Sequence, residues 1–199
     1  MILICGDSGS GKSTIASKFK LPVIECDRYH KWERGDFHWK YYSHLNPEAN
    51  DLDLMVNHSK LLEKGEKVLH RDYNHSNGKF TDPRELPTGN DIIFCGLHTF
   101  RLEGIRIYIE TSKDLKSVWK ISRDFYERGH APEKTMASIA ARDPDFKSYI
   151  ETQKKLADYI ITHDWSETLI TKIYSKGKEL TVSVEELVEI VKNENRRNM

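Results

Sequence analysis

The stretch that decides the fold is residues 2–19, Ile2-Leu3-Ile4-Cys5-Gly6-Asp7-Ser8-Gly9-Ser10-Gly11-Lys12-Ser13-Thr14-Ile15-Ala16-Ser17-Lys18-Phe19. It opens with a short apolar run that is typical of a buried strand, and residues 14–19 form a plausible helix. Between them, residues 6–13 match the pattern G-x-x-x-x-G-K-[ST]. The stretch therefore predicts a strand, a glycine-rich loop and a helix in immediate succession.

This succession is suited to wrapping a polyphosphate. Glycines let backbone N–H groups point inward, and the N-terminus of the following helix adds a favourable dipole. We expect nucleotide contacts from the whole loop: Gly6, Asp7, Ser8, Gly9, Ser10, Gly11, Lys12, Ser13 and Thr14. Lys12 would bridge the β- and γ-phosphates, and the Ser13 hydroxyl would ligate Mg²⁺. The alternative is a glycine-rich turn without a ligand, but every fixed position of the motif is present, which favours nucleotide binding.

Short apolar runs alternate with amphipathic segments along the rest of the chain. The runs that read as strands are Ile2–Cys5, Val23–Cys26, Asp91–Cys95, Ile105–Ile109 and Tyr159–Thr162. Runs this short and this rich in Ile and Val are typical of buried parallel strands. A helix over 52–62, ended by Gly65, fits between the second and third runs. The alternation predicts an α/β fold with a parallel sheet covered on both faces, built as one domain over residues 1–199.

Three further helices are punctuated clearly. Ser112 and Gly129 bound the longest one, whose apolar face is expected at helical spacing: Leu115, Val118, Trp119, Ser122 and Phe125. Pro132 is typical of a first helical position and predicts a second helix toward Arg142. Ser183 and Glu186 form a capping-box pair at the start of the last helix.

The composition limits the kinds of partner. Lys+Arg and Asp+Glu are both 31, the pI is about 7.1 and the mean hydropathy is −0.66. A balanced charge argues against a nucleic-acid binder held by phosphate neutralisation, and no apolar run approaches the roughly 20 residues that span a bilayer. Cys5, Cys26 and Cys95 lie far apart, which favours free buried thiols in a reducing compartment. We expect a cytoplasmic protein without a signal peptide, nucleic-acid partner or membrane partner; a homo-oligomer remains open.

Asp27 follows the second predicted strand directly. The carboxyl ends of parallel strands line the ligand crevice, so Asp27 could accept a proton from an acceptor hydroxyl or hold a magnesium-bound water. The alternative is an Asp that caps a turn or helix. Residues 28–87, which are aromatic, His-rich and turn-rich, predict an insert that covers the substrate.

Several segments resemble, in order, the phosphoribulokinase and uridine kinase family of P-loop kinases. They are residues 27–34, 46–54, 73–83, 94–98, 120–130 and 137–160, so the resemblance extends from residue 1 to about 162. It implies a nucleoside-kinase-like P-loop fold and ATP-dependent phosphoryl transfer to a hydroxyl of a small pentose-type acceptor, with ATP and Mg²⁺ as cofactors. His30, Arg34 and residues 48–51 favour a sugar phosphate over a nucleoside as acceptor.

The same resemblance implies roles for individual residues. Asp27 would be the catalytic base and Lys12 the phosphate clamp, and a helical lid over about 123–148 would close on the site. Acceptor or phosphoryl contacts would come from His30, Arg34, Tyr73, His75, His98, Arg123 and Arg128. Ser13, Asp27 and Asp124 would serve magnesium, with Asp124 alternatively organising the site. The bland alternative for Asp124 and Arg128 is a solvated i,i+4 pair.

Two positions depart from the family. Cys95 stands where the family has Glu, and a neutral thiol is a poor partner for Mg²⁺, which prefers oxygen. Arg28 occupies a position that is often acidic, where it could lower the pKa of Asp27 or add a phosphate contact. Two other functions therefore stay open: a nucleoside kinase, in which Tyr73 and His75 stack on a base, and a regulator that binds nucleotide without catalysing transfer.

Overall fold

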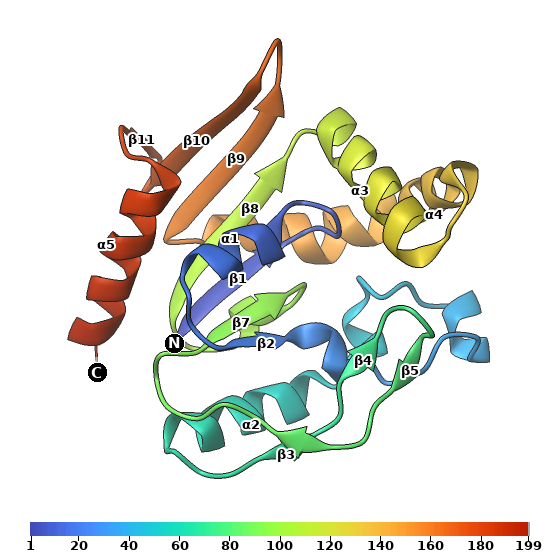
Figure 1. Cartoon of the computed structure of the whole chain (residues 1–199), viewed down its shortest axis with the longest axis horizontal. Helices are drawn as coiled ribbons and strands as arrows, with labels where there is room; N and C mark the ends of the chain where they lie inside the picture. Colours follow the sequence, from blue (N-terminus) through green and yellow to red (C-terminus); the bar gives the residue numbers. More distant parts are fainter. Residues whose placement is uncertain (199) are drawn as a thin grey trace.

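The computed structural model describes residues 1–198 and is built on a seven-stranded sheet in the order β11-β10-β9-β8-β1-β7-β2 (Figure 1). The strands are β1 (Ile2–Gly6), β2 (Val23–Glu25), β7 (Ile93–Gly96), β8 (Ile105–Thr111), β9 (Tyr159–Trp165), β10 (Leu169–Ser175) and β11 (Lys178–Leu180). Every strand predicted from an apolar run is present. Since β1 lies between β7 and β8, the loop that follows β1 emerges at the centre of the sheet.

The sheet is mostly, not entirely, parallel. Strands β2, β7, β1, β8 and β9 run parallel, whereas β10 and β11 are antiparallel to their neighbours. The predicted parallel sheet is confirmed for these five strands, and the antiparallel β10 and β11 were not predicted. Only residues 166–168 separate β9 from β10, and a parallel crossover needs a dozen or more residues.

The helices begin and end where the sequence signals place them. They are α1 (Lys12–Lys18), α2 (Leu52–Glu63), α3 (Lys113–Arg128), α4 (Pro132–Asp145) and α5 (Val184–Arg197), and 146–156 continue α4 as π and 3-10 turns. Gly129 ends α3 at φ 66°, and the capping box of Ser183 and Glu186 is formed. Within residues 1–198, no helix combines the length and apolar character needed to cross a membrane.

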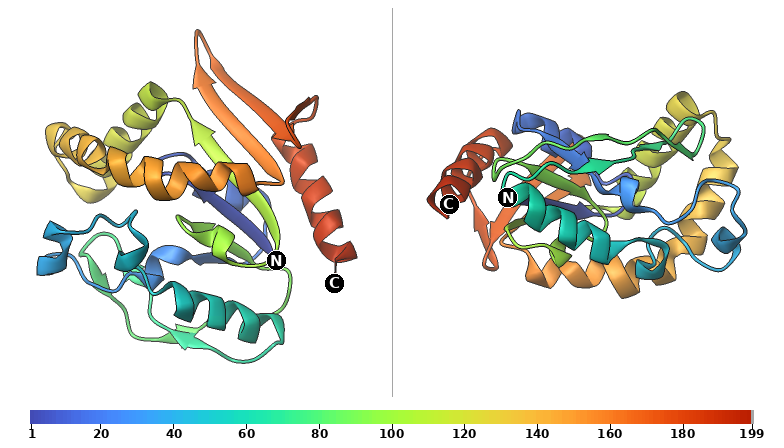
Figure 2. Two further views of the ribbon diagram at one scale, coloured as in Figure 1. Left: turned by 180° about the vertical axis from the view of Figure 1, so that it is seen from behind. Right: turned by 90° about the horizontal axis from the view of Figure 1, so that it is seen from below.

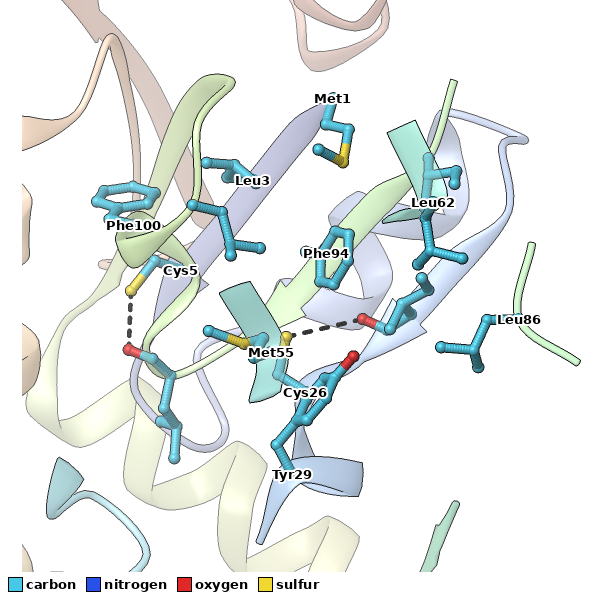
Figure 3. Close-up of a cluster of buried hydrophobic side chains, with 14 of the residues drawn as sticks. Met1, Leu3, Cys5, Cys26, Tyr29, Met55, Leu62, Leu86, Phe94 and Phe100 are labelled. Carbon is cyan, nitrogen blue, oxygen red and sulfur yellow. Dashed lines mark hydrogen bonds between the residues drawn. The ribbon is translucent and has the colours of Figure 1, made fainter. Parts of the chain in front are cut away.

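Helices cover both faces of the sheet (Figures 1 and 2). On one face, Ile15 of α1 and Leu187 of α5 pack on the strands. On the other face, Met55 of α2 and Ile150 join a second apolar cluster, shown in Figure 3. The cysteines are buried and free as expected, and in Figure 3 the Cys5 thiol donates to the Leu97 carbonyl at 3.2 Å. Alternate residues of each central strand thus enter two cores, which is what a buried parallel strand requires.

The segment predicted as an insert contains α2 and two short antiparallel pairs. These pairs are β3 (Leu69–His70) with β6 (Arg84–Glu85), and β4 (Tyr73–Asn74) with β5 (Lys79–Phe80). Tyr29, Leu45 and Leu62 enter the second apolar cluster, so the segment packs on the sheet through one side of α2 and its flanking loops. The aromatic and histidine side chains are thereby held beside the carboxyl end of β2.

The buried face of α3 differs from the predicted apolar stripe. Val118 is 62% exposed and Phe125 is 50% exposed, so the stripe is wrong at these positions. The buried side chains are instead Leu115, Lys116, Lys120 and Asp124. A helix that buries lysines and an aspartate must face a polar partner, because unpaired buried charges are very costly. That partner is the glycine-rich loop described below.

Leu62 anchors α2 and is completely buried. We expect Leu62→Ala to lower the free energy of unfolding by about 2–5 kcal/mol, from lost apolar burial and the cavity that remains. Leu69→Ala, at a side chain that is 68% exposed, is the matched control and should change stability by less than about 0.5 kcal/mol. Urea denaturation checks both, and equal losses would contradict the placement of α2.

Candidate functional site

The glycine-rich loop between β1 and α1 leaves no space for extra side chains. A Cβ atom on Gly6 would lie 2.4 Å from the Ile109 carbonyl oxygen, and the φ of Gly6 is 152°. The Lys12 ammonium donates to the Asp7 carbonyl at 2.7 Å, and the Thr111 hydroxyl donates to the Ser10 carbonyl at 3.0 Å. These contacts hold the loop in a tight arch over the start of α1, the geometry that anion binding at a helix N-terminus requires.

The buried face of α3 packs directly against this loop. The Lys116 ammonium pairs with the Asp7 carboxylate at 2.6 Å, and the Lys120 ammonium donates to the Ser8 hydroxyl at 3.4 Å. A Cβ on Gly9 would lie only 2.9 Å from the Cβ of Lys120, so a glycine is required for this approach. The lysines thus find their polar partners in the loop, which explains why the apolar stripe is displaced.

Asp124 gathers the positive charges of α3 around a carboxylate that is 5% exposed. Its oxygens lie 3.2 Å from Lys120, 2.8 Å from Arg123 and 3.3 Å from Arg128. Burial would raise the pKa of Asp124, but the hydrogen bond from Arg123 and the charge of Lys120 lower it overall. Asp124 and Arg128 are therefore not the solvated i,i+4 pair that the sequence left open. The Asp124 carboxylate instead belongs to a buried ionic network beside the loop.

Asp27 stands one residue beyond Cys26, in the 3-10 turn that follows β2, with its side chain one-third exposed. Its carboxylate lies 2.9 Å from His75 Nε2 and 3.7 Å from His30 Nε2. Burial would raise its pKa, but the hydrogen bond from His75 and the charges of His30 and Lys12 outweigh this and hold it well below the ordinary value. Asp27 is consequently an ionised acceptor at neutral pH.

Asn50 is a residue whose role the sequence reasoning missed. Its side-chain oxygen lies 2.8 Å from His30 Nδ1, while its amide donates to the His44 and Asn46 carbonyls at 3.0 and 2.9 Å. Because the amide oxygen of Asn50 is an acceptor, His30 Nδ1 carries the proton and Nε2 is turned toward Asp27. The signal was present in the segment 46–54, whose residues 48–51 were expected to favour a sugar phosphate but not to support His30.

Arg34, Tyr73 and His75 form the outer wall of the same crevice. The Arg34 guanidinium donates to the His75 carbonyl at 2.6 Å and to the Ser76 carbonyl at 3.2 Å. The Tyr73 ring is edge-on to His30 and His75, with centroids 5.3 and 5.1 Å apart. Burial raises the pKa of Tyr73, whereas the charge of Arg34 lowers it, as does that of Arg128 on α3. The insert meets the lid elsewhere, where the Ser43 hydroxyl donates to the Asp145 carboxylate at 2.6 Å.

His98 and Arg28 lie at the inner side of the crevice. His98 borders, with Asp27, a hollow of about 230 Å³, and its Nε2 is buried without a partner among residues 1–198. Burial and the charge of Arg101 lower its pKa to about 4, so it is neutral at physiological pH. Arg28 is buried, pairs with Asp72 and donates to the Glu25 carbonyl at 3.2 Å. Its Nε and Nη2 are thereby taken up by these partners, whereas its Nη1 is buried without one among residues 1–198.

A group of buried cations was not assigned any role from the sequence. Lys116, Lys120 and Arg142 line a hollow of about 340 Å³ together with Asp7 and Ser8 of the loop. The sequence did contain a signal for this group, because Lys116, Lys120 and Asp124 are four residues apart and so lie on one face of the helix. The structure thus surrounds the loop with more positive charge than Lys12 alone supplies.

Oxygen donors suited to a hard divalent cation lie close to the loop. Within residues 1–198, no group of three or more His, Cys, Asp or Glu side chains forms a metal site by itself. The Ser13 hydroxyl and the Asp27 carboxylate are nevertheless of the type that Mg²⁺ accepts alongside phosphate oxygens. Cys95 is fully buried and burial raises its thiol pKa, so it stays neutral and does not fit such an ion.

The close packing of Gly9 predicts a specific loss of nucleotide affinity. Gly9→Ala places a methyl group against Lys120 and an L-residue at φ 84°, which forces the loop away from α3. We expect ADP binding to weaken by about tenfold or more, as isothermal titration would show. Gly177→Ala, at φ 76° with open space around its Cβ, imposes comparable strain far from the loop. An equal effect of both substitutions would contradict the close-packing argument.

Because of Lys120, we expect the free energy of unfolding to depend on pH in the alkaline range. Burial and the charge of Arg142 lower its pKa to about 8, against about 10.4 in an unfolded chain. Between these values the unfolded chain binds more protons, so this group's contribution to unfolding free energy rises with pH and is constant below pH 8. The stability of the wild type relative to Lys120→Met should rise by about 1–3 kcal/mol from pH 8 to pH 10 in urea titrations. A flat or falling difference would contradict this prediction.

Comparisons with known proteins point to one family. The profile of the "Phosphoribulokinase / Uridine kinase family" matches residues 21–169. The phosphoribulokinase of Synechocystis sp. is 37% identical over 174 residues, covering 81% of this chain and 52% of that protein. The uridine kinase of Latilactobacillus sakei is 28% identical, covering 88% of this chain and 93% of that protein.

The solved structures agree in fold. The phosphoribulokinase from Rhodobacter spheroides superposes with a TM-score of 0.70 over 96% of this chain and 84% of that chain, at 18% identity. The chain spans about half the length of the curated phosphoribulokinases that it matches. The family profile and the identity to the Synechocystis protein show that this P-loop chain belongs to the phosphoribulokinase and uridine kinase family.

Proposed function

We propose that this chain transfers the γ-phosphoryl group of ATP to a hydroxyl of a pentose-type acceptor, with a sugar phosphate as the acceptor class. The observation that carries the proposal is the position of an ionised carboxylate, Asp27, across the crevice from the phosphate-binding loop. The charge of Lys12 acts on Asp27, which supports a common site for the two groups. A nucleotide phosphate and an acceptor hydroxyl would meet between them.

The nucleotide half of this proposal rests on the loop and α3. Backbone N–H groups at the start of α1, together with Lys12, suit the β- and γ-phosphates. Lys116 and Lys120 lie against Asp7 and Ser8 and add positive charge on the other side of the loop. Because phosphoryl transfer is catalysed mainly by positioning and charge stabilisation, this concentration of cations serves the transferring group.

The acceptor half rests on the arginines that face the insert. The charges of Arg34 and Arg128 both act on Tyr73. A guanidinium carries a permanent charge and forks onto phosphate oxygens, so this pair favours an acceptor that already bears a phosphate. The higher identity to phosphoribulokinases than to uridine kinases supports the same acceptor class.

Asp27 would orient and activate the acceptor hydroxyl. The hydroxyl oxygen forms the new bond to phosphorus, the bond from phosphorus to the β-phosphate oxygen breaks, and the hydroxyl proton passes to Asp27. The lowered pKa keeps Asp27 ionised before the reaction, and His30 and His75 hold it in place. Asp124 would act by holding Arg123 and Arg128, while those arginines exclude water and neutralise charge.

Mg²⁺ would be held by the Ser13 hydroxyl and the Asp27 carboxylate, and it would supply charge neutralisation for the transferring phosphoryl group. The oxygen donors of Ser13 and Asp27 fit this ion, as noted above. Asp124, the third metal ligand expected from the sequence, is already contacted by Lys120, Arg123 and Arg128. We therefore assign it to the organisation of the arginines.

A nucleoside kinase is the second candidate. The rings of Tyr73, His30 and His75 form an edge-to-face cluster at the crevice that could stack on a base. The uridine kinase of Latilactobacillus sakei also matches this chain over nearly its full length. Turnover of an unphosphorylated nucleoside would favour this candidate over a sugar-phosphate kinase.

A panel assay tests the proposed function. Coupled ADP release is measured with saturating Mg-ATP and ribulose 5-phosphate, other pentose phosphates, uridine or cytidine. We expect turnover with a pentose phosphate. Nucleoside turnover would overturn the acceptor class, and ATP binding without turnover of any acceptor would favour a nucleotide-binding regulator.

Asp27→Asn tests the role of the carboxylate within that assay. We expect kcat to fall by about a hundredfold or more, because the hydroxyl loses its proton acceptor, while ADP affinity is retained. Asp53→Asn is the matched control, since Asp53 is an exposed carboxylate in the first turn of α2. Unchanged turnover in Asp27→Asn would contradict the role given to Asp27.

A further inference from the structure

The carboxyl end of β7 carries a neutral side chain at the centre of the site. Cys95 is fully buried between β1 and β2, where it is paired in register with Ile4 and Glu25. Burial raises the pKa of its thiol, and the charge of Glu25 raises it further. This position on β7 therefore offers no negative charge.

The neighbouring strand end offers the missing charge. Glu25 is the last residue of β2, and it is the register partner of Cys95. Side chains of register partners on parallel strands project from the same face of the sheet. That face packs against α1, because Val23 and Cys95 join the same apolar cluster as Ile15. The Glu25 carboxylate thus lies on the side of the sheet where α1 and Ser13 begin.

The surroundings of Glu25 are those of the site and not of an ordinary surface carboxylate. Its pKa is raised, mainly by desolvation and by the charge of Asp27, while the charge of Lys12 opposes the rise. Within residues 1–198, no lysine or arginine forms an ion pair with it. The Glu25 side chain thus reaches solvent and is unpaired among these residues, and the charges of Lys12 and Asp27 both act on it.

We propose that Glu25 has taken over the acidic role that the end of β7 lacks, so that Ser13, Glu25 and Asp27 together serve the divalent cation of the nucleotide. The proposal rests on the proposed nucleotide site and deepens it. Oxygen donors from the loop and from one strand end would then replace a carboxylate at position 95. The competing explanation is that Glu25 has no role in the site. Since β2 is an edge strand, its charge would only discourage pairing with a strand of another molecule.

Binding of Mn²⁺ to the ADP complex separates these explanations without relying on activity. Electron paramagnetic resonance measures the Mn²⁺ affinity of the full chain with ADP, and isothermal titration measures ADP binding in EDTA. We expect Glu25→Gln to weaken Mn²⁺ binding by about 10–100-fold, with ADP binding in EDTA within twofold of the wild type. Glu179→Gln on β11 is the matched control, because it removes a strand carboxylate far from the loop. Its Mn²⁺ affinity should not change.

A double variant tests the exchange of roles between the two strands. Glu25→Gln combined with Cys95→Glu returns a carboxylate to β7, and we expect it to recover most of the lost Mn²⁺ affinity. Thermal melting of each variant confirms folding, which the exposed position of Glu25 favours. Failure of the double variant to recover affinity would overturn the exchange.

The remaining outcomes keep this inference distinct from the kinase proposal. An Mn²⁺ affinity in Glu25→Gln within twofold of the wild type overturns the role of Glu25, whatever the acceptor panel shows. A wild-type ADP complex that binds Mn²⁺ no more tightly than free ADP also overturns it. If the wild type binds ADP and Mn²⁺ but phosphorylates no acceptor, the kinase proposal is overturned, and the Mn²⁺ affinity of Glu25→Gln still tests the role of Glu25.

Discussion

The packing of cationic α3 against an anion-binding loop is the constraint on which the rest of the structure depends. A loop lined with N–H groups and Lys12 already concentrates positive charge, and α3 adds Lys116 and Lys120 to the same place. Such a cluster is tolerable only with buried counter-charges, which Asp7 and Asp124 provide. The zero net charge of the whole chain therefore conceals a strong local separation of charge.

The same constraint shows which parts of the fold a sequence can reveal. The strands and helix ends were predictable because local signals decide them: apolar runs for β1 and β8, Gly129 at the end of α3, Pro132 at the start of α4. The antiparallel β10 was missed because its residues 169–172 are exposed and carry no continuous apolar run. The predicted buried face of α3 was wrong because apolar periodicity identifies the face of a helix that packs on a hydrophobic core, whereas α3 packs on a polar loop.

The residues of the candidate site also fall into those that a local sequence pattern predicts and those that depend on tertiary contacts. The residues of the loop are fixed by a contiguous motif, and Asp27 by its place after a strand, so both were accessible to sequence reasoning. The support of His30 by Asn50 and the pairing of Lys116 with Asp7 join residues 20 and 109 positions apart. Contacts of this kind depend on how the insert and α3 are placed in space, which no local pattern encodes. The register of Glu25 with Cys95 likewise exists only once β2 and β7 are paired.

The insert fixes the acceptor side of the crevice through backbone contacts, which explains the spacing of its segment 73–78. Arg34 donates its backbone N–H to the Gly78 carbonyl at 2.8 Å, and its guanidinium bonds the two carbonyls that follow Asn74. A Cβ on Gly78 would lie 2.3 Å from the Cβ of Arg34, so the glycine permits this contact. Since His75 belongs to the same hairpin, the contact that places Arg34 also places the partner of Asp27. The orientation of the Asp27 carboxylate and the position of Arg34 are therefore set by one local structure.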